Sequence, residues 1–215
     1  MLKKMEKATR YILISFGVLA GGGIIALIVN SNSKLRADSN VLFIGDSYTA
    51  GNSSYADQLA KMLPSLRVKK IAKVGEKTDW MLRNAGNEID SKKYKAVFVL
   101  GGINDVYAGS SLNNIENNLQ AIYDKAKRAG AKVIAVTIPP TNYYGSYTDA
   151  KGYEADKLNY WIKKNRSVNK VIDMNTMLKA GGKQNLQLFA SDKLHATPQA
   201  HGMLANEIKK NIFRA

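Results

Sequence analysis

Cysteine is absent from the 215-residue chain, and histidine occurs only twice, as His195 and His201. Without cysteine the protein cannot hold a disulfide framework, a thiolate zinc site or a cysteine nucleophile. Two histidines also argue against a histidine-rich metal centre. We therefore expect neither a metal ion nor a cofactor. The lack of cysteine does not decide the compartment, because exported and cytosolic proteins can both lack it.

Acidic residues are few relative to basic ones. The 32 lysines and arginines outnumber the 17 aspartates and glutamates, which gives a net charge of +15 at pH 7. A charge of this size attracts polyanions such as nucleic acid, anionic lipid or acidic wall polymer. The basic residues are scattered along the sequence without a nucleic-acid-binding motif, which argues against nucleic acid. Contact with an anionic polymer and a lysine-rich surface without a partner both stay open.

One long stretch lacks charge altogether. Residues 11–29 (YILISFGVLAGGGIIALIV) would span about 28 Å as a helix, close to the hydrocarbon thickness of a bilayer. Residues 1–10 are rich in lysine and arginine, which favours a cytoplasmic N-terminus and an extracytoplasmic remainder. We expect a single-pass signal-anchor helix at 11–29, followed by a polar tether at 30–39 and a folded domain at 40–215.

A cleaved signal peptide is the alternative interpretation of residues 11–29. The apolar core of a signal peptide is normally about 7–15 residues long and ends in a small-x-small cleavage site. The run here is longer, and Val29-Asn30-Ser31 is a poor cleavage site. If cleavage occurred, the protein would be secreted instead of anchored.

The predicted domain alternates strand-like and helix-like segments. Continuous apolar runs, typical of parallel strands covered on both faces, occur at 41–44, 96–100, 133–136 and 171–172. Val68–Val74 alternates with lysines and predicts a half-exposed edge strand. Leu112–Ala126 has the apolar spacing of a helix that ends near Gly130, and Thr197 can cap a helix that begins at Pro198. This alternation predicts one right-handed, doubly wound α/β domain.

Four short strings follow strands or precede helices. They are Gly45-Asp46-Ser47, Gly75, Gly102-Ile103-Asn104-Asp105 and Asp192-Lys193-Leu194-His195. In a parallel sheet with strand order 2-1-3-4-5, Ser47, Gly75 and Asn104 follow the first three strands and meet at one rim. The strings contain a nucleophile, oxyanion donors, a base and a carboxylate, which together are the parts that ester hydrolysis needs.

These strings resemble the sequence blocks of the SGNH (GDSL-type) serine hydrolase family. The matching residues are GDS at 45–47, the glycine at 75, GxND at 102–105 and DxxH at 192–195. The likeness covers about residues 40–213. It implies a three-layer α/β/α sandwich with a five-stranded parallel sheet, the flavodoxin-like fold of these hydrolases. The second block departs from the family, because charged Lys73, Glu76 and Lys77 surround Gly75, and this bears on substrate preference more than on activity.

The resemblance and the chemistry of the side chains predict a role for each residue. Ser47 would attack the acyl carbonyl, with His195 as its general base and Asp192 holding the His195 ring in the useful tautomer. The backbone N–H groups of Ser47 and Gly75, together with the side-chain amide of Asn104, would bind the developing oxyanion.

Three further polar side chains are expected to stay outside the chemistry. Asp46 and Asp105 lie within the first and third strings, where we expect them to make helix caps or loop hydrogen bonds. His201 falls within the predicted terminal helix and is expected to be a surface or packing residue.

The loop after the fourth predicted strand bears on the substrate. The stretch Ile138–Gly145 resembles the corresponding loop of the thioesterase/lysophospholipase branch of the family. Tyr143, Tyr144 and Tyr147, with Tyr153 beyond them, would lie near the rim. There they would stack on sugar rings or line an acyl groove, unless they are ordinary loop aromatics.

The sequence therefore predicts a membrane-anchored, extracytoplasmic serine esterase that acts on an acylated small molecule or polysaccharide. An O-acetyl group on a cell-envelope or extracellular polysaccharide fits the outward-facing anchor, the basic domain and the polar aromatic loop. A lysophospholipase or thioesterase is the alternative enzyme. A protein of a different class, an inactive scaffold that keeps the fold and binds polyanions, also stays open.

Overall fold

A five-stranded parallel sheet forms the centre of the protein, described here for residues 33–140 and 149–214 of a computed structural model. The strands are β1 (Asn40–Gly45), β2 (Arg67–Ala72), β3 (Ala96–Leu100), β4 (Lys132–Val136) and β5 (Lys170–Ile172). Their order is β2-β1-β3-β4-β5, as predicted, and every neighbouring pair is parallel. Because the strand order reverses at β1, the carboxyl ends of β1 and β3 flank the place where α/β sheets bind ligands.

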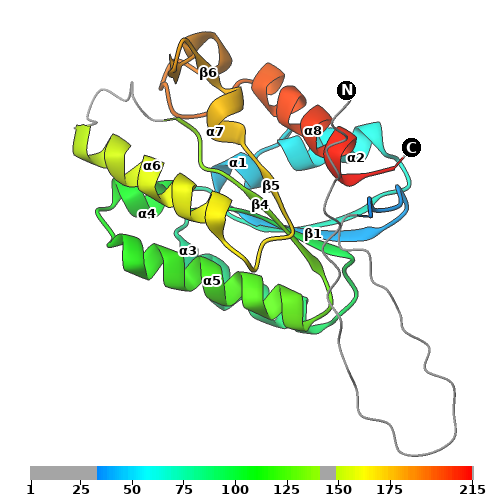
Figure 1. Cartoon of the computed structure of the whole chain (residues 1–215). Helices are drawn as coiled ribbons and strands as arrows, with labels where there is room; N and C mark the ends of the chain where they lie inside the picture. Colours follow the sequence, from blue (N-terminus) through cyan, green and yellow to red (C-terminus); the bar gives the residue numbers. More distant parts are fainter. Residues whose placement is uncertain (1–32, 141–148, 215) are drawn as a thin grey trace, which may run out of the picture. The chain divides into compact units, whose positions relative to one another are not determined.

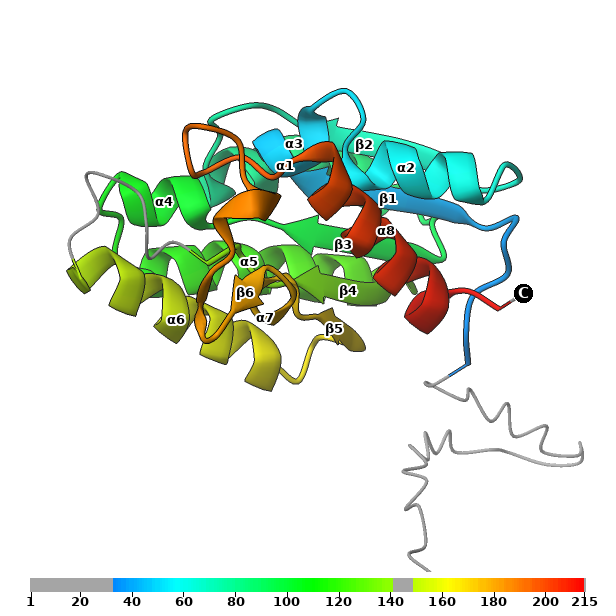
Figure 2. The same ribbon diagram turned by 90° about the horizontal axis from the view of Figure 1, so that it is seen from above.

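Helices cover both faces of this sheet (Figures 1 and 2). One face carries α2 (Tyr55–Met62) and α8 (Pro198–Ile212), and the other carries α3 (Thr78–Asp90), α5 (Leu112–Arg128) and α6 (Asp149–Lys164). The sheet and its two helical covers make three layers, as the family resemblance implied. Shorter elements are α1 (Ser47–Ala50), α4 (Ile103–Tyr107), α7 (Met174–Met177), the 3-10 turn Leu186–Leu188, and the hairpin of β6 (Lys179–Ala180) and β7 (Lys183–Gln184).

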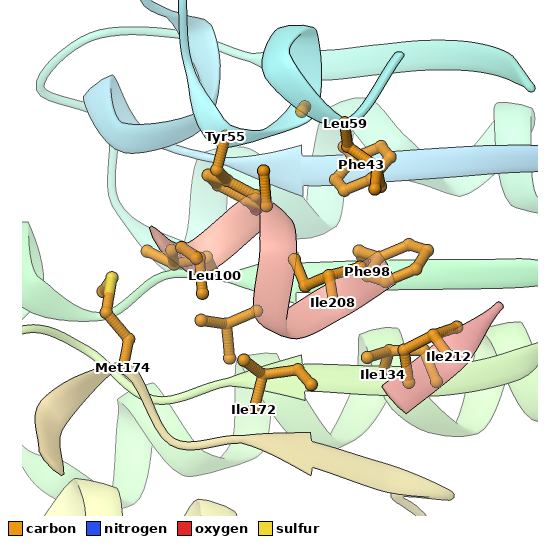
Figure 3. Close-up of a cluster of buried hydrophobic side chains, with 14 of the residues drawn as sticks. Phe43, Tyr55, Leu59, Phe98, Leu100, Ile134, Ile172, Met174, Ile208 and Ile212 are labelled. Atoms are coloured by element: carbon orange, nitrogen blue, oxygen red, sulfur yellow. The ribbon is translucent and has the colours of Figure 1, made fainter. Parts of the chain in front are cut away.

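The core on the α8 side is built around two stacked aromatic rings. Phe43 of β1 and Phe98 of β3 lie nearly parallel, with ring centroids 4.4 Å apart and an interplanar angle of 9°. Figure 3 shows Ile208 and Ile212 of α8 in the same buried cluster. These contacts fix α8 on the sheet, and α8 in turn holds the loop that precedes it near the sheet's carboxyl rim.

Strand β1 is buried on both faces. Phe43 belongs to the cluster under α8, whereas Leu42 and Ile44 belong to the cluster under α3 and α5. Successive side chains of a strand point to opposite faces, so a strand between two helical layers must be apolar at every position. Each such side chain contributes about 1.5–3 kcal/mol when it is fully buried.

Local signals set the helix ends that the sequence predicted. The Thr197 hydroxyl accepts a hydrogen bond from the backbone N–H of Ala200, and Pro198 is the first residue of α8. After α5, Gly130 has a φ of +82°, and the next N–H donates to the carbonyl of Ala126. A left-handed residue at this place is a common way for a helix to end, and glycine adopts it without a steric penalty.

The folded domain begins within the stretch predicted as a tether. Leu35 is buried, its N–H donates to the Ile212 carbonyl at 2.7 Å, and its own carbonyl accepts from Arg214. Residue 35 therefore belongs to the domain that was expected to start at residue 40, because its apolar side chain joins the core under α8.

The predicted edge strand ends two residues early. Strand β2 stops at Ala72, and Val74 is 65% exposed in the loop that follows.

The predicted membrane span, residues 11–29, lies outside the described residues, as do residues 1–10. Within the ranges 33–140 and 149–214, no helix combines the length and the apolar character needed to cross a bilayer.

Candidate active site

Ser47 is the first residue of α1, two residues after the end of β1 at Gly45. Asp46 caps the helix, and its carboxylate accepts a hydrogen bond from the Tyr48 N–H at 3.0 Å. Gly45 leaves no room for a side chain, since a Cβ there would lie 2.2 Å from Thr49 Oγ1 and 2.7 Å from the Leu100 carbonyl oxygen. The close approach of β1, α1 and β3 thus requires glycine before the serine.

His195 reaches Ser47 from a loop far along the chain. Its Nε2 lies 3.1 Å from Ser47 Oγ, and its Nδ1 lies 2.6 Å from Asp192 Oδ2. An ionised carboxylate can only accept, so Nδ1 carries the proton and Nε2 presents its lone pair to Ser47. The distance between Ser47 and His195 is within the hydrogen-bond range that proton transfer requires.

Asp192 is itself held by its own loop. Its Oδ1 accepts from the backbone N–H groups of Leu194 and His195, each at 2.9 Å. Partial burial opposes ionisation of this carboxyl, but the hydrogen bonds from the His195 ring and the two N–H groups outweigh it and lower its pKa. Both oxygens are therefore in use, and the carboxylate points at the imidazole. The His195 side chain is 44% exposed, so the site is open to solvent.

Gly75 follows β2 with a left-handed backbone, at a φ of +76°. Nothing lies within 4 Å of the position of a Cβ there, so conformation and not space favours glycine at this site.

Asn104 follows β3, at the start of α4, and its side-chain amide donates to the Glu76 carbonyl at 2.9 Å. An amide nitrogen carries two hydrogens, and this bond uses one of them.

A buried carboxylate locks these two loops together. Asp105 accepts from the N–H of Thr78 at 2.9 Å and from its hydroxyl at 2.8 Å. Asp105 is only 3% exposed, and Thr78 begins α3. The third string is thus tied to the second by Asn104 and Asp105, and Asp105 makes the loop hydrogen bonds that we expected of it.

The structure brings most of the predicted site together. Ser47, His195 and Asp192 form one hydrogen-bonded chain, and the Gly75 and Asn104 loops are joined at the same rim of the sheet. The predicted substrate-binding residues Tyr143, Tyr144 and Tyr147 lie outside the described residues. Tyr153 is on α6, 65% exposed, with Lys157 Nζ 4.7 Å from its ring centroid.

Tyr48 is a site neighbour that sequence reasoning missed. Its hydroxyl donates to the Leu194 carbonyl at 2.5 Å, and its ring centroid lies 6.4 Å from that of His195. The side chain is 1% exposed. Its position directly after Ser47 was the only signal, and position alone does not reveal a contact across 146 residues of sequence.

Beside this tyrosine lie Asp46, which is buried, and His201, which is half-buried. The His201 ring stacks on Tyr55 at 6.4 Å, and burial lowers its pKa to about 4, so it is a neutral packing residue as predicted. Burial raises the pKa of Asp46 to about 7, even though the Tyr48 N–H favours the ionised form.

A polar hollow borders the Asn104 side of the rim. It has a volume of about 330 Å³ and is lined by Lys77, Asp79, Asp105, Ser110, Asn114, Asn117 and Asn118. Among the described residues, no group of three or more histidine, aspartate or glutamate side chains could hold a metal ion.

Family comparison places this geometry in a known class. Residues 43–203 match the GDSL-like lipase/acylhydrolase family, which is more than half of the chain. The chain therefore belongs to this family, as the four strings predicted.

Solved structures share the fold at low sequence identity. A GDSL-like lipase from Bacteroides thetaiotaomicron is 17% identical with a TM-score of 0.69, covering 81% of this chain and 88% of that one. An esterase, EstA, from Pseudoalteromonas sp., in a structure inhibited by monoethylphosphonate, is 20% identical with a TM-score of 0.61, covering 81% and 97%. At these identities the likeness shows the fold alone.

Curated relatives with higher identity are much longer proteins. An N-acylneuraminate cytidylyltransferase of Streptococcus agalactiae serotype V is 30% identical over 129 residues, which are 59% of this chain and 30% of that protein. Proteins of the same name from serotypes III and Ia match over the same length. The present chain thus spans less than a third of the length of these relatives.

Proposed function

We propose that Ser47, His195 and Asp192 are the catalytic triad of this hydrolase. The observation that carries the proposal is the continuous hydrogen-bonded chain from Ser47 Oγ through both nitrogens of His195 to Asp192 Oδ2, at 3.1 and 2.6 Å. A serine hydroxyl is a weak nucleophile alone, and it becomes effective when a neutral imidazole accepts its proton. The Asp192 carboxylate stabilises the imidazolium that results.

The reaction then proceeds in two halves. Ser47 Oγ attacks the acyl carbonyl carbon while its proton passes to Nε2 of His195, and the collapse of the tetrahedral intermediate returns that proton to the leaving alcohol. A water molecule next attacks the acyl-serine and gives a proton to the same nitrogen. Breaking the bond from the acyl carbon to Ser47 Oγ releases the acid, and the proton on Nε2 restores the hydroxyl.

The oxyanion of each intermediate would be bound by three donors. These are the backbone N–H groups of Ser47 and Gly75 and the second hydrogen of the Asn104 amide. The bond from Asn104 to the Glu76 carbonyl supports this role, because it holds the amide in place before the substrate arrives. Preorganised donors of this kind cost no reorganisation when charge develops.

As substrate we propose an O-acetyl ester on a cell-envelope or extracellular polysaccharide. A site that is open to solvent and bordered by a polar hollow suits a hydrated sugar better than a long acyl chain. The longer relatives are named for N-acylneuraminate, an acidic sugar, and the net charge of +15 would attract an acidic polymer.

We further propose that residues 11–29 anchor the protein, with the hydrolase domain outside the cytoplasm. The apolar run and the basic residues before it support this arrangement. A cysteine placed at the exposed Asn52 should react with a membrane-impermeant maleimide in intact cells, since the chain has no cysteine of its own. Labelling only after lysis would place the domain inside the cell instead.

The experiment that tests the function is hydrolysis of 4-nitrophenyl esters from acetate to decanoate by the full chain in detergent. Turnover should be fastest on acetate and disappear in Ser47→Ala. Ser91→Ala, an exposed serine at the far end of the sheet, is the matched control and should retain full activity. A preference for long chains would favour a lysophospholipase or thioesterase. No Ser47-dependent turnover on any ester, together with retained polyanion binding, would favour the inactive scaffold.

A further inference from the structure

Basic side chains gather at the end of the domain opposite Ser47. All strands of a parallel sheet begin at one edge, and the helices that connect them end at that same edge. In Figures 1 and 2 this is the end where β1 begins and α8 finishes. We call it the basic pole. It consists of the basic residues at the strand starts (Arg67, Lys95, Lys132 and Lys170), those in the last turns of α2, α5, α6 and α8, and Arg214.

In the five-stranded sheet, each strand other than β1 starts at or next to a basic residue. These residues are Arg67, Lys95, Lys132 and Lys170. Backbone hydrogen bonds align them across the sheet edge: the Lys132 N–H donates to the Lys95 carbonyl at 3.0 Å, and the Lys95 N–H donates to Asn40 at 2.9 Å. Neighbouring strands lie about 4.8 Å apart, so Lys95 and Lys132 are neighbours at this edge. Asn40 of β1 lies between Arg67 and Lys95, and Lys170 lies opposite Ile134, two residues into β4.

The helix ends add a second set of charges. The last turns of α2, α5, α6 and α8 contain Lys61, Lys125, Lys127, Arg128, Lys163, Lys164, Lys209 and Lys210. Nearby carboxylates pair with only some of these cations, as in the pairs of Lys125 with Asp90 and Lys163 with Asp173. Within the described residues, no carboxylate lies within 4.0 Å of the charged groups of Lys95, Lys127, Lys170, Lys210 and Arg214.

Helix dipoles do not account for the whole pole. The negative C-terminal end of a helix favours lysine and arginine in its last turn. That explanation does not reach Lys95 and Lys170, which lie at strand starts. Carboxylates occur at both ends, as in the pair of Lys73 with Glu76 near Ser47 and the pair of Lys125 with Asp90 at the pole, but at the pole basic residues from several strands and helices lie together. The basic residues are scattered in sequence, but the fold collects them at one end.

The chain enters the folded domain at this pole. Leu35 pairs with Phe213, beside a hollow of about 430 Å³ lined by Arg36, Ala37, Asp38, Ser65 and Arg214. The uncharged run ends at residue 29, so residues 30–34 connect it to Leu35. Even fully extended, this connection reaches only about 20 Å. A domain tethered so closely at its basic end would present that end to the membrane.

We propose that the basic pole docks on anionic phospholipid headgroups of the membrane that holds residues 11–29. Attraction between lysine-rich surfaces and anionic lipids needs no shaped pocket, only many cations within a Debye length of the bilayer. Strand β1 has six residues and extends about 20 Å from this pole to the turn that carries Ser47. Docking therefore points the Ser47 rim away from the bilayer, toward polymer and not toward membrane lipid. This inference rests on the proposed anchor and deepens the proposed choice of substrate.

Energy transfer from the domain to the bilayer tests the orientation. Because the chain has no native cysteine, a donor dye can be placed at Ser91→Cys near the pole or at Asn52→Cys near Ser47. The full chain is reconstituted in phosphatidylcholine bilayers with and without phosphatidylglycerol, with an acceptor dye on a lipid. Phosphatidylglycerol should raise transfer from residue 91 well above transfer from residue 52, and high salt should reverse the increase. Equal transfer from both positions would overturn the proposal.

Charge reversal supplies the matched comparison. A variant with Lys95→Glu, Lys170→Glu and Lys210→Glu should bind anionic vesicles about tenfold more weakly or worse. A control with Lys73→Glu, Lys157→Glu and Lys183→Glu has the same net charge and should dock as the wild type does. Equal loss in both variants would reduce the effect to net charge and overturn the proposal. Binding of the pole to soluble polyphosphate without binding to anionic vesicles would also overturn the proposal.

Failure of docking can be separated from failure of the other proposals. Flotation of the full chain with neutral vesicles reports the anchor alone, and Ser47→Ala should leave docking unchanged while abolishing turnover. The pole variant should hydrolyse 4-nitrophenyl acetate in detergent at the wild-type rate. If the chain floats with neutral vesicles but phosphatidylglycerol changes nothing, the anchor stands and docking is wrong.

Discussion

The phenol of Tyr48 donates a hydrogen bond to the backbone carbonyl of Leu194, with 2.5 Å between the oxygens. Tyr48 follows the proposed nucleophile directly, and Leu194 precedes the proposed base. The contact therefore joins the two segments whose separation sets the distance between Ser47 and His195. The Tyr48 ring is buried, so this link is shielded from water.

Tyr48→Phe should lower kcat about tenfold and leave KM unchanged, because a small misplacement of the base affects the reaction more than substrate binding. Loss of the bond should also cost about 1 kcal/mol of stability. Tyr94→Phe is the control, since Tyr94 donates to Glu88 at the far end of the sheet. It should cost similar stability without changing kcat. Equal effects of the two variants on kcat would show that Tyr48 has no positioning role.

Asn104→Ala should lower kcat by about 10²–10³ if its amide binds the oxyanion. Binding of a phosphonate inhibitor, which carries a tetrahedral anion, should weaken in parallel. Asn84→Ala is the matched control, because that amide donates to the Trp80 carbonyl on the exposed side of α3 at 2.8 Å. If Asn104→Ala changes only KM, Asn104 binds the ground state and not the transition state.

Asp46→Asn should stabilise the protein increasingly as the pH rises from about 4 to 7. Burial raises the folded-state pKa of Asp46 from its ordinary value of 3.8 to about 7. In this window the folded protein holds a proton that the unfolded chain has released, so rising pH favours unfolding. A shift of about three units corresponds to about 4 kcal/mol, and the cost is constant above pH 7.

Urea unfolding of wild type and Asp46→Asn across this pH range measures the difference directly. The amide keeps an acceptor for the Tyr48 N–H, so the comparison isolates the titration. Asp38→Asn is the control, because the hydrogen bond from Arg36 lowers the pKa of Asp38 and gives the opposite sign. A difference between wild type and Asp46→Asn that does not vary with pH would contradict the prediction.

Two glycines near the site should respond differently to alanine. Gly45→Ala places a Cβ 2.7 Å from the Leu100 carbonyl, which belongs to a buried strand and cannot move aside. Overpacking of this kind costs about 1–3 kcal/mol or more, and the displaced turn should remove most activity. In Gly75→Ala the new Cβ meets open space, so the only penalty is the strain of an alanine in the left-handed backbone conformation. This strain should lower the stability by about 1–2 kcal/mol. Thermal unfolding and kcat of both variants test this order, and a larger loss in Gly75→Ala would reverse it.

Local patterns in the sequence were enough to predict the architecture. Both faces of β1 are covered, so its apolar run was continuous, and Thr197 with Pro198 marked the start of α8. These signals depend on residues a few positions apart, and neighbouring residues carry most of the information about strands, caps and turns. The domain start was predicted five residues late, because a single apolar residue, Leu35, does not form a pattern.

The family strings named the site residues for a related reason. In a parallel sheet the loops after successive strands meet at one rim, so Ser47, Gly75 and Asn104 could be expected there from strand order alone. The sequence did not reveal Tyr48, whose partner is 146 residues away, or the polar hollow beside Asp105. Contacts of that range depend on how packed elements face each other.

What the sequence determined by itself was the order of strands and helices, the family and the residue types available for chemistry. Only the tertiary structure decided that Nε2 of His195 lies 3.1 Å from Ser47 Oγ, that Asp46 is buried enough to raise its pKa to about 7, and that basic residues from strand starts and helix ends lie at one end of the sheet. Each of these depends on through-space distance or on exclusion of water. Neither quantity is a property of neighbouring residues in the chain, because both arise when the sheet and its two helical layers pack together.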